Sequence, residues 1–289
     1  MTRTEDAKKK RTGQFRVLFD LDDVEKVPPW GKAGEYKLHW YGLTFGRFWI
    51  ETASGQPLEY TSEIQRSWSL RCKNPDYFVA RLFEDMLSVL PSALEQVPAD
   101  IALRFANRSW RTNAERWRDT AENDLRWDRW YSATQWWHGR TLDLGYLQHA
   151  PELAFWRTAE EVFFQWHADD SADGIPVWTV PEGQIVISTA AFESEVLRFG
   201  EELLACMDSR IRSIRRRGWQ RRDCVLDVEE LAKEQTLRRE AFHKIAHAQR
   251  ATDWRQVRAS LDVLLALMGE PITANLSLPI WANFLETRF

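Results

Sequence analysis

The sequence predicts an α+β fold that is predominantly helical, with short antiparallel β-hairpins near the N-terminus and in mid-chain packed on a helical body. Apolar residues recur every three or four positions over several long segments, which is the period of an amphipathic helix. In two other segments, apolar and polar residues alternate between glycines and prolines, a pattern typical of half-buried strands joined by turns. The 289 residues are 44% hydrophobic and 28% charged, so the chain has the composition of an ordinary globular protein.

The domain organisation follows from the distribution of polar residues. Residues 1–12 are polar, include four consecutive basic residues from Lys8 to Arg11, and are not followed by the apolar run of a signal peptide. They predict a disordered tail. No linker rich in glycine, proline or serine divides residues 13–289, which predicts a single globular domain. A C-terminal helical subdomain over residues 190–289 is the alternative arrangement.

Two segments predict hairpins. From Tyr36 to Tyr60, Leu38 and Trp40 alternate with polar residues, glycines mark a turn, and the alternation then resumes. Residues 177–188 contain two short apolar runs around Pro181-Glu182-Gly183, which is a typical turn sequence.

Helical periodicity covers most of the remaining chain. Asn74 and Pro75 form a typical helix start, and Pro91 a stop, for a helix over residues 75–90. The other expected helices are one or two over residues 110–137, one from Pro151 to about His167, one from Phe192 that stops by Gly218, one over about residues 231–245 and one over residues 254–265.

The bulk properties favour a soluble protein of the cytoplasm. The net charge is −4, so there is no global basic field of the kind that marks a nucleic-acid binder. The three cysteines form no CxxC pair, which indicates a reducing compartment and neither a disulfide framework nor a zinc knuckle. The longest stretch without charge, residues 271–285, is too short and too interrupted to cross a membrane.

The sequence contains none of the common catalytic or nucleotide-binding motifs. There is no GxGxxG, no Walker loop, no GxSxG elbow and no kinase motif set. These absences remove support from the common nucleotide and hydrolase chemistries, and no cofactor is predicted.

An arginine-rich segment is the main candidate binding site. Residues 208–223 contain seven arginines and two aspartates, a local net charge of 7 − 2 = +5 in a chain whose net charge is −4. Such a segment could bind an acidic protein surface or phosphates, although arginines also occur on the solvated face at the end of any helix. The candidate partner-binding residues are Arg212, Arg215, Arg216, Arg217, Trp219 and Arg221.

The tryptophan-rich segment over residues 110–137 has two interpretations. It contains six tryptophans mixed with arginines, a combination that binds single-stranded nucleic acid. Acidic residues are interspersed among them, and buried tryptophans with arginines stacked at the rim explain the pattern more simply.

A second candidate site is a weak metal-binding pattern. His243 and His247 lie four residues apart on one helical face, with Glu240 one turn earlier. In a zincin the residue after the first histidine is glutamate, whereas this chain has Lys244. The predicted helix also places these side chains away from its apolar stripe, so we expect them to face solvent, and no metal site is predicted.

Several stretches of the sequence resemble an uncharacterised bacterial family of unknown function. The resemblance rests on the motif PPWG…LHWYGLTxGRFWI, on YFVARLFED, and on shorter stretches, which lie at residues 28–31, 38–50, 77–85, 151–156 and 252–254. It spans most of the chain after the tail, which favours a single unit. It implies no activity, and therefore no functional residue can be transferred. The general character of the chain is only loosely similar to that of toxin-immunity proteins.

These observations favour a non-enzymatic cytosolic binding protein that recognises a protein partner, with a bacterial toxin-neutralising immunity protein as its specific form. One alternative is an enzyme whose site is assembled from dispersed groups such as His39, His138, His149 and His167. The other alternative is a nucleic-acid-binding protein that uses the segment from Arg210 to Arg222, which the acidic net charge disfavours.

Overall fold

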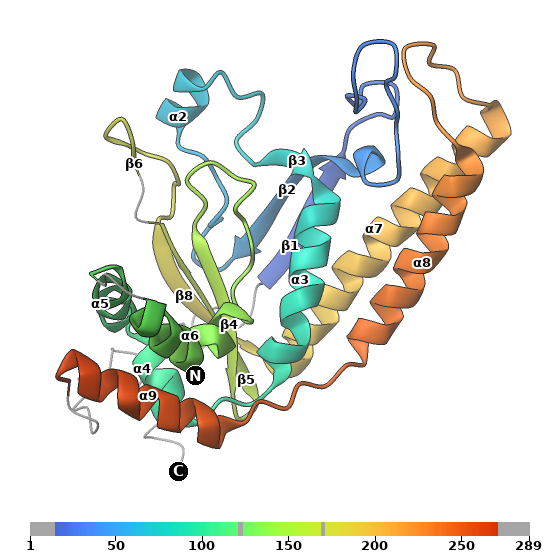
Figure 1. The fold of residues 1–289 in the computed structure, drawn as a ribbon. Coiled ribbons are helices and arrows are strands. Elements are labelled where there is room, and N and C mark those ends of the chain that lie inside the picture. The colour runs from blue at the N-terminus through green and yellow to red at the C-terminus, as the bar shows by residue number, and fades with distance from the viewer. Residues whose placement is uncertain (1–14, 121–123, 169–170, 271–289) are drawn as a thin grey trace, which may run out of the picture.

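The computed structural model describes residues 15–120, 124–168 and 171–270, and its fold is α+β and rich in helix, as the sequence predicts (Figure 1). The strands are β1 (Phe15–Leu21), β2 (Phe45–Thr52), β3 (Asp76–Phe78), β4 (Glu152–Thr158), β5 (Glu161–His167), β6 (Ser171–Ala172), β7 (Ile175–Pro176) and β8 (Glu182–Ser188). The helices are the short 3-10 helix η1 (Gly42–Thr44), α2 (Ser62–Ser67), α3 (Val79–Leu94), α4 (Ala99–Ala106), α5 (Arg108–Asp119), α6 (Asp124–His138), α7 (Thr189–Arg217), α8 (Val228–Ala246) and α9 (Trp254–Met268).

An antiparallel sheet of β4, β5 and β8 separates two hydrophobic cores. Successive side chains of a strand point to opposite faces of its sheet. Phe155 and Phe164 therefore pack in the first core, whereas their neighbours Trp156 and Phe163 pack in the second. Because both faces are covered, the strands are almost continuously apolar.

The first core lies between this sheet, the sheet of β1, β2 and β3, and the helices α3, α7 and α8. Figure 1 shows α7 and α8 side by side as a long helical hairpin. Gly200 permits this close packing, because a Cβ atom there would lie 2.4 Å from the ring of Phe242 on α8. Trp40 is fully buried, and its indole N–H donates to Gln235 at 2.6 Å. This hydrogen bond ties the N-terminal region to α8.

The second core lies between the opposite face of the sheet and the helices α4, α5, α6 and α9. Trp136 and Trp137 of α6 are buried there, and Trp254 at the start of α9 packs edge-on against Trp136 at 5.3 Å. The three C-terminal helices are thus shared between two cores: α7 and α8 pack in the first and α9 in the second. Residues 190–270 do not pack together as one separate helical unit.

The three helices predicted in the C-terminal third are confirmed, although each extends a few residues beyond the predicted bounds. Ser188 caps the N-terminus of α7, and Gly218 ends it with a φ of 75°, a conformation that favours glycine. Asp227 and Asp253 accept hydrogen bonds from the first backbone N–H groups of α8 and α9. The tryptophan-rich segment, for which one or two helices are predicted, forms the two helices α5 and α6.

The predicted helix over residues 75–90 is displaced in the structure. Asn74 does not cap a helix; its side-chain amide donates to the carbonyl of Leu58 at 3.2 Å. Residues 76–78 form β3, and α3 begins at Val79. Pro91 lies inside α3, which continues to Leu94.

The predicted helix from Pro151 to His167 is wrong. These residues form the hairpin of β4 and β5, with Thr158 paired with Glu161. A strand covered on both faces lacks polar alternation, and a short continuous apolar run is equally compatible with a buried helix. The hairpin predicted over residues 177–188 is also wrong, because β8 pairs with β5 rather than with residues 177–180.

Only one strand of the hairpin predicted within residues 36–60 forms, and it pairs with an earlier segment of the chain. β2 pairs with β1, with Val17 opposite Ile50, and not with the segment around Leu38 and Trp40. Leu38 and Trp40 are both buried although they do not lie in a ladder. Their alternation reflects core packing of an irregular segment, which has the same sequence pattern as a strand.

In the described part of the chain, no helix combines the length and the apolar character that are needed to span a bilayer. The predicted tail and the uncharged stretch over residues 271–285 lie outside the described residues.

Candidate functional site at the C-terminal end of α7

The last three turns of α7 present arginines on its exposed face. Ile211 and Ile214 are buried in the first core, whereas Arg212 and Arg216 lie four residues apart on the opposite side and are exposed. Arg217 is also exposed, and so is Arg222 in the loop after the helix. Among the described residues, none of these four arginines makes an ion pair or a side-chain hydrogen bond. Their charges are therefore free to meet a partner.

Three of the six predicted partner-binding residues have structural roles instead. Arg215 pairs with Glu229 of α8 at 2.9 Å. Arg221 pairs with Asp223 at 2.6 Å and donates to the carbonyl of Val27 at 2.5 Å. The indole N–H of Trp219 donates to the carbonyl of Cys224 at 2.9 Å. These contacts fix the loop between α7 and α8, so the free residues of the predicted set are Arg212, Arg216 and Arg217.

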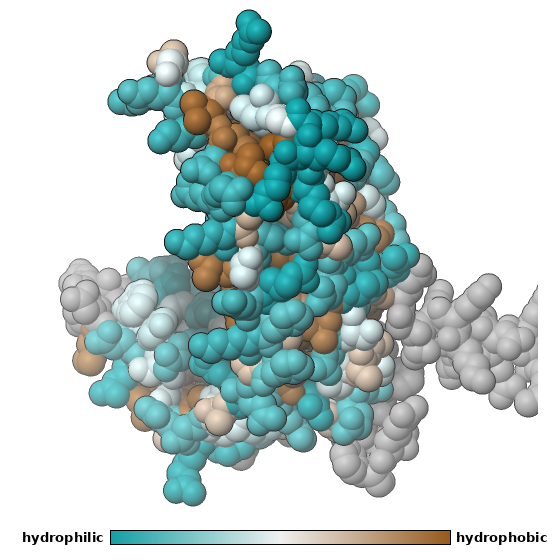
Figure 2. Space-filling view, turned by 90° about the vertical axis from the view of Figure 1, so that its right-hand side faces the viewer, coloured by the Kyte–Doolittle hydropathy of each residue, from teal (hydrophilic) through white to brown (hydrophobic). Residues whose placement is uncertain are grey.

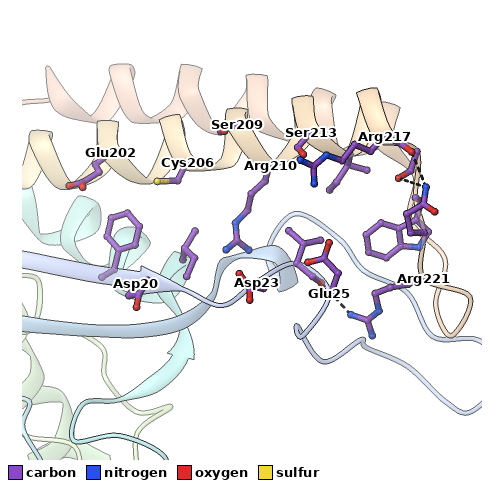
Figure 3. Close-up of a pocket in the computed structure, with 17 residues that line it drawn as sticks. Asp20, Asp23, Glu25, Glu202, Cys206, Ser209, Arg210, Ser213, Arg217 and Arg221 are labelled. Carbon is purple, nitrogen blue, oxygen red and sulfur yellow. Dashed lines mark hydrogen bonds between the residues drawn. The ribbon is translucent and has the colours of Figure 1, made fainter.

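A groove of about 540 Å³ runs between α7 and the end of β1 with the loop that follows it (Figure 3). Cys206, Ser213 and Arg217 lie along the α7 side of the groove, spaced by seven and four residues. Asp20, Asp23 and Glu25 lie along the opposite side. We refer to this cavity as the β1–α7 groove. The wall formed by β1 and its loop is acidic, whereas the α7 wall carries Glu202 as well as Arg210 and Arg217.

Arg210 crosses the β1–α7 groove from α7 towards Asp23 (Figure 3). Its guanidinium donates to the carbonyl of Leu43 at 2.7 Å and to the carbonyl of Asp22. Burial lowers its pKa, although nearby acidic groups oppose this effect. Arg210 thus joins the two walls, and its donors are already engaged by the protein.

Two exposed apolar side chains, Trp30 and Val225, lie on segments connected to the loop that follows α7. Lys37 forms backbone bridges to Trp30 on one side and to Val225 on the other, which places these residues on one small three-segment sheet. Trp30 is 57% exposed and Val225 is 65% exposed. Figure 2 faces α7 and α8, and it shows hydrophobic residues near the top surrounded by hydrophilic ones. We call Trp30, Val225, Arg216, Arg217 and Arg222 the arginine surface.

The predicted metal-binding pattern lies on the solvent-exposed side of α8. His243, His247 and Glu240 are all exposed, as the position of the apolar stripe predicts. Over residues 15–120, 124–168 and 171–270, no group of three or more histidine, cysteine, aspartate or glutamate side chains is arranged to hold a metal ion. The three cysteines are free thiols.

The four dispersed histidines do not converge on one site. His39 lies beside Trp30, His138 beside Trp130, His149 stacks on Trp68, and His167 lies 3.6 Å from Glu182. His39 and His149 lie apart from the other two, whereas His138 and His167 are both within electrostatic range of Glu152, the residue opposite His167 in the ladder of β4 and β5.

Sequence reasoning missed a buried acid on α3. Asp85 is 6% exposed, and burial raises its pKa to about 7, an effect that Arg81 opposes. Its Oδ2 atom and the hydroxyls of Tyr41 and Tyr146 are buried without hydrogen-bond partners. The available signal was an aspartate on the apolar face of a predicted helix. Tyr146 lines a second cavity of about 450 Å³, but Asp85 does not, so we assign Asp85 no catalytic role.

The tryptophan-rich segment is largely structural. Trp110, Trp130, Trp136 and Trp137 are buried, and Arg118 lies 4.3 Å above the ring of Trp130. This confirms the interpretation of core tryptophans with stacked arginines. Trp127 is the exception: it is 49% exposed and stacks on Tyr131.

Comparisons with known proteins agree with the resemblance to an uncharacterised family. No curated protein and no solved structure matches the chain. The model of one family, described as "Family of unknown function (DUF5984)", matches residues 16–260, which is most of the chain, and the protein therefore belongs to this family.

Proposed function

We propose that this protein is a non-enzymatic binding protein that recognises an acidic region of a partner protein through the arginine surface. One observation carries the proposal: Arg212, Arg216, Arg217 and Arg222 are exposed and make no ion pair with any described residue, and Val225, which is also exposed, follows Arg222 by three residues. An arginine with no intramolecular partner keeps its planar set of five donors available for a carboxylate.

The composition of the arginine surface is that of a protein interface. Tryptophan and arginine are enriched among residues that contribute most to binding, where an apolar centre is surrounded by a polar rim. Trp30 and Val225 supply apolar area, and the arginines supply the rim. Backbone hydrogen bonds on both sides of Lys37 hold Trp30 and Val225 in place. Little conformational entropy would therefore be lost when a partner binds.

The distribution of charge favours protein over nucleic acid. Asp20, Asp23 and Glu25 line the groove next to Arg217 and would repel a phosphate backbone. A protein partner can place carboxylates over the arginines and basic or neutral groups over the acidic wall. The specific form of the proposal is a bacterial toxin that this protein neutralises in the cytoplasm, and it rests only on the general likeness to immunity proteins.

The test is affinity capture of the full chain from its own cells, with protein and nucleic acid both quantified in the eluate. We expect one stoichiometric protein partner, which is lost from the variant Arg216→Glu/Arg217→Glu. The matched control is Arg129→Glu/Arg255→Glu, which makes the same change in net charge at exposed arginines of α6 and α9. Recovery of no stoichiometric protein, equal recovery by all three chains, or recovery of nucleic acid in its place would each contradict the proposal.

A further inference from the structure

β1 is an edge strand, and half of its backbone groups point away from the sheet. The strand order is β1-β2-β3, so only one side of β1 is paired. In an antiparallel ladder, alternate residues bond to the neighbouring strand, and those between them direct their N–H and C=O groups outwards. Val17 has its N–H and C=O engaged by α7, and Asp22 donates to Phe45 of β2. The outward-facing residues of β1 are therefore Phe15, Val17, Phe19 and Leu21.

At Val17, side chains of α7 replace a neighbouring strand. The N–H of Val17 donates to a carboxylate oxygen of Glu195 at 2.7 Å, and its carbonyl accepts from Arg198 at 2.6 Å. Glu195 and Arg198 also pair with each other at 2.7 Å. One acceptor and one donor thus close the edge of β1 at this position.

At Phe19 and Leu21, no side chain replaces the missing strand. Over the described residues, no hydrogen bond links the outward N–H or C=O group of either residue to another part of the chain. Both residues line the β1–α7 groove. Since natural proteins usually close or cover an exposed strand edge, as this one does at Val17, the open part of β1 is a place where another chain can pair.

We propose that the β1–α7 groove binds an extended segment of the partner protein, which adds to the sheet as a strand beside β1. The inference rests on the proposed function and specifies how the partner is held. The segment pairs through its backbone with Phe19 and Leu21, as in known cases of β-strand addition. Its position on the groove floor is bounded at one end by Glu195 and Arg198.

The groove also specifies the side chains of the segment. Arg217 lies on the α7 wall beyond the point where Arg210 crosses the groove to the carbonyl of Asp22, and it makes no ion pair with any described residue, so it favours a carboxylate where the segment leaves the groove past Leu21. The partly buried side chains of Phe19, Leu21 and Trp219 give the groove an apolar surface. Alternate side chains of an added strand point to the same face, so an apolar residue two positions from the carboxylate fits it.

The test uses a displayed library of random linear peptides selected on the full-length chain. We expect enrichment of peptides that contain an acidic residue close to an apolar one. Their affinity should fall at least about tenfold for Leu21→Pro, because proline removes the outward N–H group and leaves a peptide carbonyl unpaired. Leu21→Ala is the matched control, because it also loses the leucine side chain but keeps the N–H group, so it should bind the peptides about threefold or more tighter than Leu21→Pro. Proline is tolerated where the N–H faces away from the sheet.

Hydrogen exchange on the wild-type chain makes the outcome independent of how well Leu21→Pro folds. Without peptide, the amides of Phe19 and Leu21 should exchange faster than those of Leu18 and Asp20, and peptide binding should slow the first pair. No enriched peptide, equal affinity for Leu21→Pro and wild type, or unchanged exchange at Phe19 and Leu21 would overturn the strand addition. If a captured protein partner is lost from Arg216→Glu/Arg217→Glu but retained by Leu21→Pro, the binding function stands and the strand addition fails.

Discussion

Two arginine-rich regions of this molecule have similar compositions and different environments. In α5 and α6, arginines are mixed with tryptophans, and they stack on them: Arg111 lies 4.7 Å from the ring centre of Trp137, and Arg118 lies 4.3 Å from that of Trp130. At the end of α7, Arg212, Arg216 and Arg217 are exposed and contact neither an aromatic ring nor an acidic group among the described residues. Proximity to a hydrophobic core thus separates structural arginines from those available for binding, and composition does not.

The largest effect on stability is expected for a buried arginine. Arg140 has a side-chain exposure of 1%, pairs with Glu95 at 2.7 Å, and lies 5.2 Å from the rings of both Trp136 and Trp254. Arg140→Met should lower the free energy of unfolding by about 3–5 kcal/mol, because it leaves Glu95 without its buried counter-charge. Arg216→Met, an exposed arginine, should change it by less than about 0.5 kcal/mol. Urea unfolding of both variants measures the two changes in free energy. Similar values would show that burial does not separate structural arginines from those available for binding.

The second prediction concerns the buried carboxyl group of Asp85. The pKa of Asp85 is about 7 in the folded chain, and the usual value is 3.8, so the folded state binds an extra proton between these pH values. Stability should therefore fall as pH rises through this window, by up to about 4 kcal/mol. Asp85→Asn should remove this part of the pH dependence and make the chain more stable than wild type at pH 8.

Denaturant unfolding from pH 4 to pH 8 measures this difference. Asp143→Asn is the control, since Asp143 lies near Asp85 in the same charge cluster but is exposed. Its curve should parallel that of wild type. An Asp85→Asn variant that is less stable than wild type at pH 8 would mean that the ionised carboxylate is stabilised by its surroundings.

The third prediction applies to the exposed arginines. With an isolated protein partner, Arg216→Glu/Arg217→Glu should weaken binding by about 10- to 100-fold, because two attractive contacts become repulsive. The loss should be greatest at low salt and shrink as ionic strength rises. Titration calorimetry at several salt concentrations measures this, and an affinity that does not respond to salt would exclude the arginines as contacts.

The smallest effect is expected where an arginine is stacked but remains partly exposed. Arg118 covers Trp130, and its side chain is 25% exposed. Arg118→Met should lower stability by about 0.5–1 kcal/mol, the usual contribution of a cation–π contact at such a site. Arg118→Lys, which keeps the charge, should lose less. Equal losses for the two variants would show that packing rather than charge is responsible.

The sequence predicts the helices of this protein better than its strands. α7, α8 and α9 each bury one stripe and carry capping residues, and local sequence is sufficient to identify such helices. β4 and β5 are buried on both faces, so their apolar residues do not alternate. The partner of β2 lies far earlier in the chain (48 − 19 = 29 residues for the pair of Phe19 and Phe48), and spacing cannot reveal such a pairing.

The candidate site could be predicted only in part. The arginines of residues 208–223 stand out in the sequence, but which of them are engaged depends on distant groups such as the Val27 carbonyl for Arg221. The open edge at Phe19 and Leu21 could not be foreseen either. It depends on a three-dimensional register between β1 and α7, in which Glu195 and Arg198 reach Val17, whereas no side chain in the described part of the chain bonds to the outward groups of Phe19 and Leu21.

The most direct test of the difference between the two arginine-rich regions is hydrogen exchange of the chain, measured by mass spectrometry with and without its captured protein partner. The account predicts slower exchange on binding at residues 17–26, 30–37 and 210–226, and no change in α5 and α6. Slower exchange confined to α5 and α6, with none at the end of α7, would contradict it.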